Sequence, residues 1–465
     1  MPHKPSAAES LFLKGNRHMA AGDAARAEAN FREAIRRGPG LAEAHANLGL
    51  LLDRSGNPVE AEKHYRQSIA CAPACGETHL NLGALLTGAK RFDEADSAVR
   101  CALALMPESV AAWSNLGVLQ ACRKQEAEAE RSYRMALALD SDYRLASFNL
   151  AYLLLRQGRF EEGWRRLEAR NWYAALDTHL DCPRWRGESL QGKSVLIGFE
   201  AGHGDMIQFG RYAAELKARG ATRVTVLCHP PLATLFATLD GADSALAFDQ
   251  AYPASTWDYW TPPLSIPFHC GTRLDSIPAR LPYLRAAPEK SETWAQRLAT
   301  HCSPDDLRVG LVWKGNPRFE NDADRSLPSL AALATLGRIP GVRYFSLQKG
   351  AGEDEAAAPP ASLPLVDLGP YIRDFSDTAA IVTNLDLVIS VDTAAAHLAG
   401  ALGKRCWVLL PDYKTDWRWL AGREDSPWYP GVMRLFRQPG MGDWSAVLTA
   451  VCAALRDLQR KPGAT

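Results

Sequence analysis

The 465-residue sequence predicts an α + α/β protein, in which a solenoid of paired helices precedes two parallel-sheet halves. Residues recur at a fixed step of 34 positions through the first third of the chain, which is typical of stacked helical repeats. Farther on, short apolar runs of strand length alternate with helical stretches, as in parallel sheets that helices cover. We therefore expect a repeat domain over residues 1–172, a first sheet domain with a linker over 173–290, and a second sheet domain over 291–465.

The repeats share small, aromatic and proline positions. At the 34-residue step stand Ala27, Ala61, Ala95 and Ala129; Phe31, Tyr65, Val99 and Tyr133; and Pro39, Pro73 and Pro107. This is the tetratricopeptide (TPR) signature, in which each repeat is a helix pair and the stacked pairs form a concave binding surface. Five repeats are expected, with starts near Ser6, Leu41, Cys75, Ser109 and Tyr143. Such arrays bind proteins, so a protein partner is predicted.

A row of asparagines follows the same step, at Asn47, Asn81, Asn115 and Asn149. Asparagine is not favoured inside a helix, but its amide offers a donor and an acceptor that match a peptide group. The row resembles the asparagine ladder in the TPR groove of O-GlcNAc transferase, which implies a hold on an extended backbone. Leu13 interrupts it in the first repeat. The alternative, that each asparagine only bonds the neighbouring repeat, stays open.

The composition excludes several classes of protein. Lysine plus arginine number 53, as do aspartate plus glutamate, so the basic excess of a nucleic-acid-binding protein is missing. No apolar run is long enough for a transmembrane helix, and the first nine residues lack the apolar core of a signal peptide. The ten cysteines show no paired metal-site spacing and are expected to be reduced, small hydrophobic residues. We therefore expect a cytoplasmic protein without a metal site.

The second part of the chain should contain two strand–helix series. The first has predicted strands at Val195–Phe199, Val224–Cys228 and Ala245–Phe248, helices at Gly204–Leu216 and Leu232–Leu239, and a linker at Pro278–Lys290. The second has strands at Val309–Trp313, Tyr344–Leu347, Leu387–Ser390 and Cys406–Leu410, and helices near Ser329–Leu336, Asp377–Thr383 and Thr393–Leu402. Two such halves place the expected ligand site at the carboxyl ends of their strands.

The first segment with a chemical pattern is Glu200-Ala-Gly-His-Gly-Asp205, directly after a predicted strand. Its glycines allow a tight strand-to-helix turn and a close approach of the backbone. Asp205 would then open a helix at the edge where the ligand site is expected. The alternative is that Asp205 only caps this helix, which aspartate does well.

The second segment begins at Lys314, just beyond another predicted strand, and continues through a polar loop to Arg325. These cations suit a diphosphate leaving group, since arginine binds it with two bonds and lysine as a point charge. The alternative is a loop that is simply solvated. The loop also contains Asp322-Ala-Asp324, which matches the Asp-x-Asp pattern of metal-dependent glycosyltransferases. We discount that pattern because it is short and does not end a strand.

The third segment runs from a buried strand into a helix, with Asp392 and Thr393 at the junction and His397 one turn later. Helix N-termini offer free N–H groups and the positive end of the helix dipole, which suit phosphates. Thr393 and His397 share a helix face because they are four residues apart. Taken alone, the segment is better explained as a capped helix with a buried histidine.

Together, the three segments resemble the heptosyltransferase-like glycosyltransferases of the GT-B fold, over about residues 193–458. The similarity is closest to bacterial proteins that join TPRs to this domain, flagellin glycosyltransferases among them. Further matching segments are Phe160–Trp164, Trp417–Trp419, Ser426–Pro430 and Arg434–Arg437. The chain departs from its relatives at His203, where they have leucine, and at Ala394, where heptosyltransferases often have glycine.

The resemblance implies a role for each segment. Asp205 would be the base for the acceptor hydroxyl. The departing phosphate would be stabilised by Lys314, Arg325 and the helix start at Thr393. The nucleotide-sugar, linked to CMP, ADP or UDP, would be positioned by Asp392 and His397, with its base near Gln348 and Lys349. No metal and no prosthetic group are implied.

Aromatic residues after the last predicted strand are expected to form a lid over the donor sugar or the acceptor. They are Trp417, Trp419, Trp428 and Tyr429. The alternative is that these rings close the hydrophobic seam between the two halves.

Three functions remain open on the sequence alone. The favoured one is sugar transfer to serine or threonine hydroxyls of a protein recruited by the TPR array, with flagellin as the best single guess. The second is a transferase that acts on a lipid-linked or polysaccharide acceptor. The third is a non-catalytic TPR scaffold with a degenerate GT-B domain.

Overall fold

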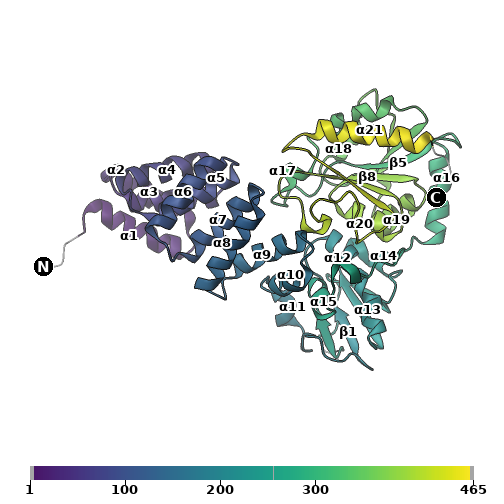
Figure 1. Cartoon of the computed structure of the whole chain (residues 1–465), viewed down its shortest axis with the longest axis horizontal. Coiled ribbons are helices and arrows are strands. Elements are labelled where there is room, and N and C mark those ends of the chain that lie inside the picture. The colour runs from purple at the N-terminus through teal and green to yellow at the C-terminus, as the bar shows by residue number, and fades with distance from the viewer. Residues whose placement is uncertain (1–4, 255, 461–465) are drawn as a thin grey trace. The chain divides into compact units, whose positions relative to one another are not determined.

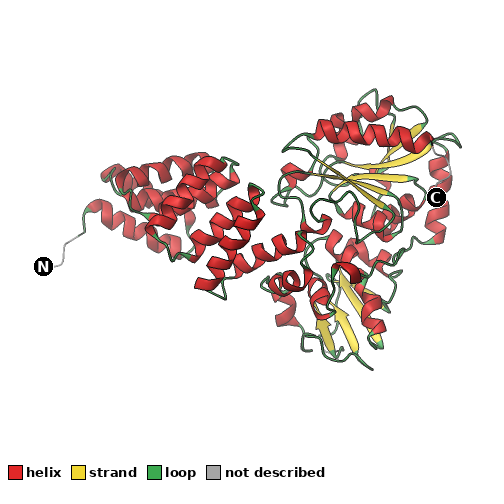
Figure 2. Cartoon of the chain, in the orientation of Figure 1, coloured by secondary structure: helices red, strands yellow, loops and turns green. Residues whose placement is uncertain are grey.

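The computed structural model describes residues 5–254 and 256–460. The chain divides into two compact units, the first ending at Leu153 and the second beginning at Leu154. The first is all helical, and the second combines helices with parallel sheets (Figures 1 and 2). The sequence placed the end of the repeat domain at residue 172, about one helix farther along the chain.

The first unit is a TPR solenoid. Its helices are α1 (Ala7–Ala20), α2 (Ala24–Arg37), α3 (Ala42–Arg54), α4 (Pro58–Cys71), α5 (Gly76–Gly88), α6 (Phe92–Leu105), α7 (Val110–Cys122), α8 (Glu126–Leu139) and α9 (Arg144–Arg156), the last of which runs through the boundary. The expected repeat starts lie directly before α1, α3, α5, α7 and α9. The predicted helix pairs are therefore confirmed.

A glycine in the first helix of the first four pairs lets the second helix approach closely. A side chain placed on Gly49 would meet the Tyr65 ring at 2.8 Å, and one on Gly117 would meet the Tyr133 ring at 2.5 Å. The aromatic positions of the repeat therefore fill the space that the glycine leaves. In the fifth repeat Ala151 stands at the glycine position.

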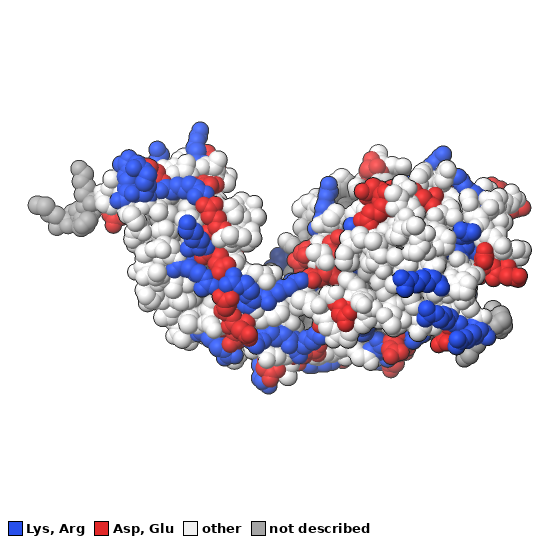
Figure 3. Space-filling model, turned by 90° about the horizontal axis from the view of Figure 1, so that it is seen from above, with Lys and Arg blue, Asp and Glu red and all other residues white. Residues whose placement is uncertain are grey.

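Ion pairs connect successive repeats along the surface. Arg32 contacts Glu60 at 2.7 Å, and Arg66 contacts Glu94 at 2.7 Å. In Figure 3, blue and red atoms alternate over this unit, and neither colour forms a broad patch. Exposed pairs of this kind contribute little stability each, and on the face seen in Figure 3 they leave no broad basic patch.

The second unit contains two sheets whose paired strands are all parallel. The first has the order β3-β2-β1-β4, with β1 (Ser194–Ile197), β2 (Arg223–Cys228), β3 (Ser244–Ala247) and β4 (Tyr259–Thr261). The second has the order β10-β9-β8-β5-β6-β7, with β5 (Leu307–Val312), β6 (Val342–Ser346), β7 (Leu365–Asp367), β8 (Leu387–Val391), β9 (Cys406–Leu410) and β10 (Met433–Arg437). The two predicted sheets are confirmed, but the edge strands β4, β7 and β10 were not anticipated. They are short or carry alternating charges, so no apolar run marks them.

The helices of this unit differ from the sequence expectations in detail. They are α10 (Phe160–Leu167), α11 (Ala174–His179), α12 (His203–Gly210), α13 (Tyr212–Ala218), α14 (Ala233–Phe236), α15 (Ile266–His269), α16 (Pro288–Ala299), α17 (Asp322–Arg325), α18 (Glu353–Ala356), α19 (Phe375–Thr383), α20 (Ala394–Ala401) and α21 (Trp444–Arg460). The helix expected at 204–216 is two helices that meet at Arg211. The segment near 329–336 is a 3-10 helix, Leu330–Arg338, and the expected linker at 278–290 ends within α16.

Helix α10 belongs to the second unit because its aromatic face is buried there. Trp164 is 1% exposed, and its indole N–H donates to the Thr272 carbonyl at 3.0 Å. Its ring lies 5.3 Å from that of Trp417 and 6.4 Å from that of Phe209. The helical periodicity of α10 continues that of the repeats, which explains why the sequence assigned it to them.

We predict that Gly117→Val destabilises the TPR unit. The added side chain would collide with Tyr133, and overpacking of this kind costs about 1–3 kcal/mol. Urea unfolding followed by circular dichroism should show a lower midpoint. Gly88→Ala is the control, because no atom lies within 4 Å of its added carbon. An equal loss in both variants would show that the close helix approach is not what Gly117 provides.

Candidate functional site

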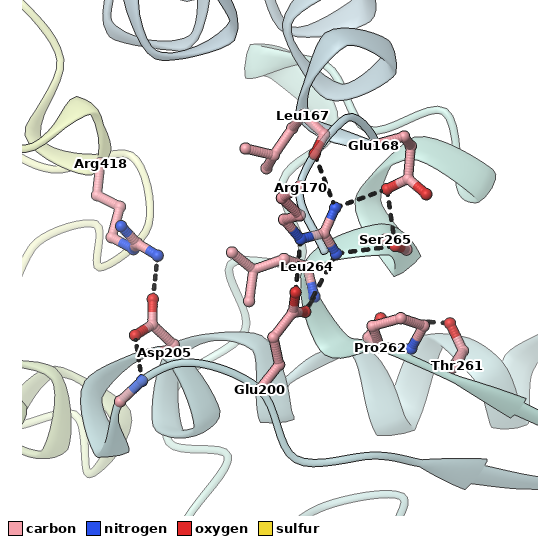
Figure 4. A network of polar contacts seen from close by, with 11 residues as sticks. Leu167, Glu168, Arg170, Glu200, Asp205, Thr261, Pro262, Leu264, Ser265 and Arg418 are labelled. Atoms are coloured by element: carbon pink, nitrogen blue, oxygen red, sulfur yellow. Dashed lines mark hydrogen bonds and ion pairs between the residues drawn. The ribbon is translucent and has the colours of Figure 1, made fainter. Parts of the chain in front are cut away.

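Asp205 lies in the first turn of α12, directly after β1. Its Oδ2 accepts from the Gly202 N–H at 2.8 Å, so the capping role considered from the sequence is present. Its Oδ1 accepts from the Arg418 guanidinium, which comes from the short 3-10 turn Trp417–Trp419 beyond β9 (Figure 4). Asp205 is therefore both a helix cap and one half of an ion pair between the two sheet halves.

The loop before α12 is fixed from both sides. Ala201 has φ +56°, a left-handed conformation that is uncommon for a non-glycine residue. Its carbonyl contacts the His229 Nε2 at 3.0 Å. His203 packs at 4.7 Å from the His229 ring and 5.2 Å from Phe375. Burial, and then His229, lower the pKa of His203 to about 4, so it is uncharged at neutral pH.

A buried ion pair anchors the start of this loop. Both Arg170 and Glu200 have side chains that are 0% exposed, and Arg170 Nε and Nη2 donate to the two Glu200 carboxylate oxygens at 2.6 and 3.1 Å (Figure 4). Arg170 also donates to Ser265 Oγ at 2.9 Å and to Glu168 at 2.8 Å. Burial raises the pKa of Glu200, and the Arg170 guanidinium acts against this.

The third segment provides a helix N-terminus without a side-chain cap. Thr393 precedes α20, but its hydroxyl contacts Ser390 Oγ at 2.9 Å instead of a backbone N–H. The first turn of α20 carries no acidic residue. Such a turn, made of alanines, presents backbone N–H groups and the positive helix end to an anion.

The first and third segments lie against each other. A side-chain carbon on Gly204 would stand 2.9 Å from His397 Cδ2 and 3.5 Å from the Ala394 Cα. Only glycine permits this approach of α12 to α20. The structure therefore brings the start of α12, which carries Asp205, close to the N-terminal turn of α20.

Asp392 and His397 both have pKa values shifted by burial. Burial, and then the charge of Asp416, raise the pKa of Asp392 to about 6, while Arg325 and Arg418 act in the opposite direction. His397 is 4% exposed, and burial lowers its pKa well below the usual value. Its Nδ1 contacts the Tyr429 hydroxyl at 2.8 Å. The structure thus gives His397 a packing role at the α12–α20 contact.

The cations assigned to the donor are each paired with a carboxylate. Lys314 Nζ lies 2.7 Å from Glu355, and Arg325 Nε lies 3.1 Å from Asp322. Asp322 is only 9% exposed and also accepts from Ser326 Oγ at 3.0 Å, so this part of the loop is not simply solvated. Among the described residues, no group of three or more His, Cys, Asp or Glu side chains could hold a metal ion.

Gln348 does not present its amide to a nucleotide base. Its Oε1 accepts from the backbone N–H groups of Trp313 and Lys314 at 3.0 and 3.1 Å, and its Nε2 donates to carbonyls of Lys314 and Ala351 at 3.0 and 2.8 Å. It holds the loop beyond β5 in place. Lys349 Nζ contacts Glu353 at 2.5 Å and the Gly369 carbonyl at 3.0 Å.

The aromatic residues expected as a lid are part of the core. Trp417 is 1% exposed, and Trp419, Trp428 and Tyr429 are 0% exposed. Their rings pack with one another, with Trp164 and Phe209, and with His397, which lies 5.1 Å from the stacked Trp419 ring. The structure therefore supports the alternative, a hydrophobic seam between the halves. Because these four rings are buried, none of them is available to cover a ligand.

A buried arginine crosses the same seam. Arg211, where α12 meets α13, donates to the Trp428 carbonyl at 2.5 Å and to the Tyr283 hydroxyl at 3.1 Å. Its guanidinium lies 4.7 Å from the ring centres of Tyr283 and Tyr429. Aromatic faces and carbonyl oxygens thus surround this cation.

Sequence reasoning missed several partners at the site. Arg418 stands between two tryptophans that were noticed, and Arg170 follows the last repeat, but neither position carries a pattern that predicts its partner. Glu355, which accepts from the Trp313 indole at 3.2 Å as well as pairing with Lys314, lies in an ordinary polar stretch. The one sequence feature that could have drawn attention to Arg418 is its position between two tryptophans.

The asparagine row is half-buried throughout. Asn47 donates to Asn16 Oδ1 of the preceding repeat at 2.7 Å, so for this member the stacking alternative is seen. Among the described residues, no side-chain hydrogen bond involves Asn81, Asn115 or Asn149. Their amides remain open to another molecule.

Two surface hollows lie away from Asp205. One, of about 380 Å³, is at the start of α10 and is lined by Arg159, Phe160 and Arg165. The other, of about 590 Å³, lies between α6, α7 and α8 and is lined by Leu103, Trp113 and Met135, among other residues. At the site itself, the Asp205 side chain is 21% exposed and contacts Arg418 of the other half.

Comparisons with known proteins support the repeat assignment. A family model described as tetratricopeptide repeat matches residues 12–74 and 125–163. Protein FlbA of Caulobacter vibrioides is 28% identical over 344 residues, which cover 68% of this chain and 56% of that protein. The chain thus spans little more than half the length of this relative.

Solved structures give weak overall likenesses. Pseudomonas aeruginosa pilF is 23% identical with a TM-score of 0.33, covering 37% of this chain and 80% of that chain. MamA from Desulfovibrio magneticus RS-1 is 17% identical with a TM-score of 0.33, covering 38% of this chain and 99% of that chain. Within the described residues, no helix has the length and apolarity needed to cross a membrane.

We predict that Arg170→Met destabilises the second unit by about 3–5 kcal/mol, because it leaves the Glu200 carboxylate buried without its partner. Arg170→Met combined with Glu200→Leu should recover part of the loss. Urea unfolding measures both. Arg273→Met, which removes an exposed partner of Asp275, is the control and should change stability by less than about 0.5 kcal/mol. A double variant less stable than the single would contradict this account.

Asp392 predicts a pH dependence of stability. The pKa of Asp392 is raised in the folded protein, so the protonated carboxyl stabilises the fold relative to the ionised one. This stability is fully present below about pH 4 and is lost as the pH rises through about 6. Asp392→Asn should be more stable than the parent protein at pH 7.5, by on the order of 2 kcal/mol, and no more stable at pH 4. Thermal melts across this range test it. Asp354→Asn, at an exposed carboxylate, is the control; the same pH profile in both variants would refute the prediction.

Proposed function

We propose that the second unit is a GT-B glycosyltransferase that moves a sugar from a nucleotide-sugar to serine or threonine hydroxyls of a protein. The observation that carries this proposal is the contact of Gly204, the residue before Asp205, with Ala394 and His397 of α20, a helix whose N-terminus has no side-chain cap. A base and an anion-binding turn at the carboxyl ends of two parallel sheets are what transfer from a nucleotide-sugar requires.

The chemistry would follow from these positions. The phosphate nearest the sugar would lie at the N-terminal turn of α20, with Arg325 and Lys314 as further cations. The acceptor hydroxyl oxygen would form a bond to the anomeric carbon while the bond from that carbon to the phosphate oxygen breaks. The hydroxyl proton would pass to Asp205, and the nucleotide would leave with the electron pair of the broken bond.

The TPR unit supports a protein as the acceptor. TPR arrays present extended surfaces to other polypeptides, and the amides of Asn81, Asn115 and Asn149 are open to a peptide backbone. Flagellin is the acceptor to test first, on the strength of the similarity to TPR-linked flagellin glycosyltransferases.

A second candidate is a non-catalytic scaffold, and one observation favours it. Lys314, Arg325 and Arg418 are each paired with a carboxylate, so the side chains of the chain itself compensate these three charges. A scaffold of this kind would bind no nucleotide. Calorimetric titration with CMP, ADP and UDP distinguishes it from a transferase.

We predict that flagellin from the source cells loses mass when the gene is deleted, and equally when it carries Asp205→Ala, because both remove transfer. The intact mass should fall by sugar-sized increments, and the increment identifies the class of sugar. Asp354→Ala is the control and should leave the mass of flagellin unchanged. Full glycosylation in the Asp205→Ala strain would show that the base is another residue. An unchanged mass after deletion would exclude flagellin as the acceptor.

A further inference from the structure

We propose that Arg418 exchanges its contact with Asp205 for a phosphate of the donor, so that Asp205 becomes available as a base only after the donor has bound. This inference rests on the proposed function, because it needs a nucleotide at the N-terminus of α20. It adds a residue and an order of events that the sequence did not indicate.

Both oxygens of Asp205 are engaged in the structure. Oδ2 accepts from the Gly202 N–H at 2.8 Å, and Oδ1 accepts from Arg418 Nη2. Each oxygen therefore already accepts from one donor, and the Arg418 guanidinium competes with an incoming hydroxyl for Oδ1. The Gly202 bond belongs to the cap of α12 and is fixed with the helix. The contact with Arg418 is the one that can open without disturbing secondary structure.

Arg418 has a second carboxylate that would keep it in place. Its Nη1 lies 3.0 Å from both oxygens of Asp416, and its backbone N–H donates to Asp416 at 2.9 Å. The guanidinium also lies 4.5 Å from the centre of the Trp417 ring. Nη2 can therefore change partner while Nη1 and the backbone stay bound. A guanidinium is suited to this, because its fixed fork of donors fits carboxylate and phosphate alike.

The position of Arg418 puts it next to the anion-binding turn. Trp419, the following residue, stacks on His397 of α20 at 5.1 Å. Burial, and then the charge of Arg418, lower the pKa of His397 on α20. Lys314 and Arg325 are paired with carboxylates of their own half. Of these three cations, Arg418 is the one whose partner is the candidate base Asp205. Donor binding to Arg418 would therefore release the carboxylate of Asp205.

Backbone strain lies on both sides of the contact. Ala201, four residues before Asp205, has φ +56°, and Leu420, two residues after Arg418, has φ +52°. Non-glycine residues in this region cost free energy and cluster at switch and ligand-binding segments. The two residues therefore mark the turns that carry Asp205 and Arg418 as candidate switch segments.

The test is a double-mutant cycle on nucleotide affinity, measured by calorimetry on the full chain. CMP, ADP and UDP are titrated into the unmodified protein, and the one that binds is used throughout. Asp205→Asn removes the carboxylate charge yet keeps an oxygen for the Gly202 N–H. It should bind the nucleotide roughly tenfold or more tightly, since Arg418 no longer has to leave Asp205. Arg418→Ala should bind more weakly.

The cycle separates exchange from simple repulsion between carboxylate and phosphate. In the Arg418→Ala background, Asp205→Asn should have little further effect. Equal tightening of nucleotide binding in both backgrounds would mean repulsion and would overturn the exchange, as would an unchanged affinity in Asp205→Asn.

Asp205→Ala is a second variant that frees Arg418, and it should also bind the nucleotide more tightly. Arg423→Ala and Asp425→Asn are matched controls, because each breaks an exposed ion pair in the same segment and should leave nucleotide affinity unchanged. If the unmodified protein binds none of the three nucleotides, the proposed function itself fails.

Discussion

The close approach of α12 to α20 is the constraint on which the site depends. Gly204 has no side chain, so the backbone that carries Asp205 can lie against Ala394 and His397. Any larger residue would separate the two sheet halves at this point. With the helices apart, the contact between Arg418 and Asp205 would be lost.

Packing at the seam keeps this approach in one geometry. Trp164, Trp417 and Trp428 pack edge to face, and Arg211 is held among carbonyls and aromatic faces. Large buried rings favour a few discrete arrangements over a continuous range. Charged groups lie at the rim of this apolar layer, where burial changes their proton affinities, as at Asp392. The shifted pKa values at the site therefore follow from its packing.

The sequence predicted what depends on local pattern. The 34-residue period indicated the helix pairs, and the junctions at Asp205 and Thr393 were placed correctly because a strand followed by small residues and a helix start is a local signal. It did not predict contacts between distant segments. The Asp205–Arg418 pair joins residues more than two hundred positions apart, and Gln348 was assigned to a nucleotide base because nothing in its neighbourhood shows that backbone groups occupy its amide. The buried tryptophans were misassigned for the same reason, since exposure depends on tertiary packing.

Burial of Trp164 bears on how such a chain could be assembled by gene fusion. The helix that carries this ring continues the repeat periodicity, yet its side chain completes the core of the second unit. A recombination breakpoint at the apparent end of the repeats would remove a tryptophan and the arginine that neutralises Glu200. A boundary placed before Leu154 would leave the residues of this core together in the sequence, whereas one placed after α10 would divide them.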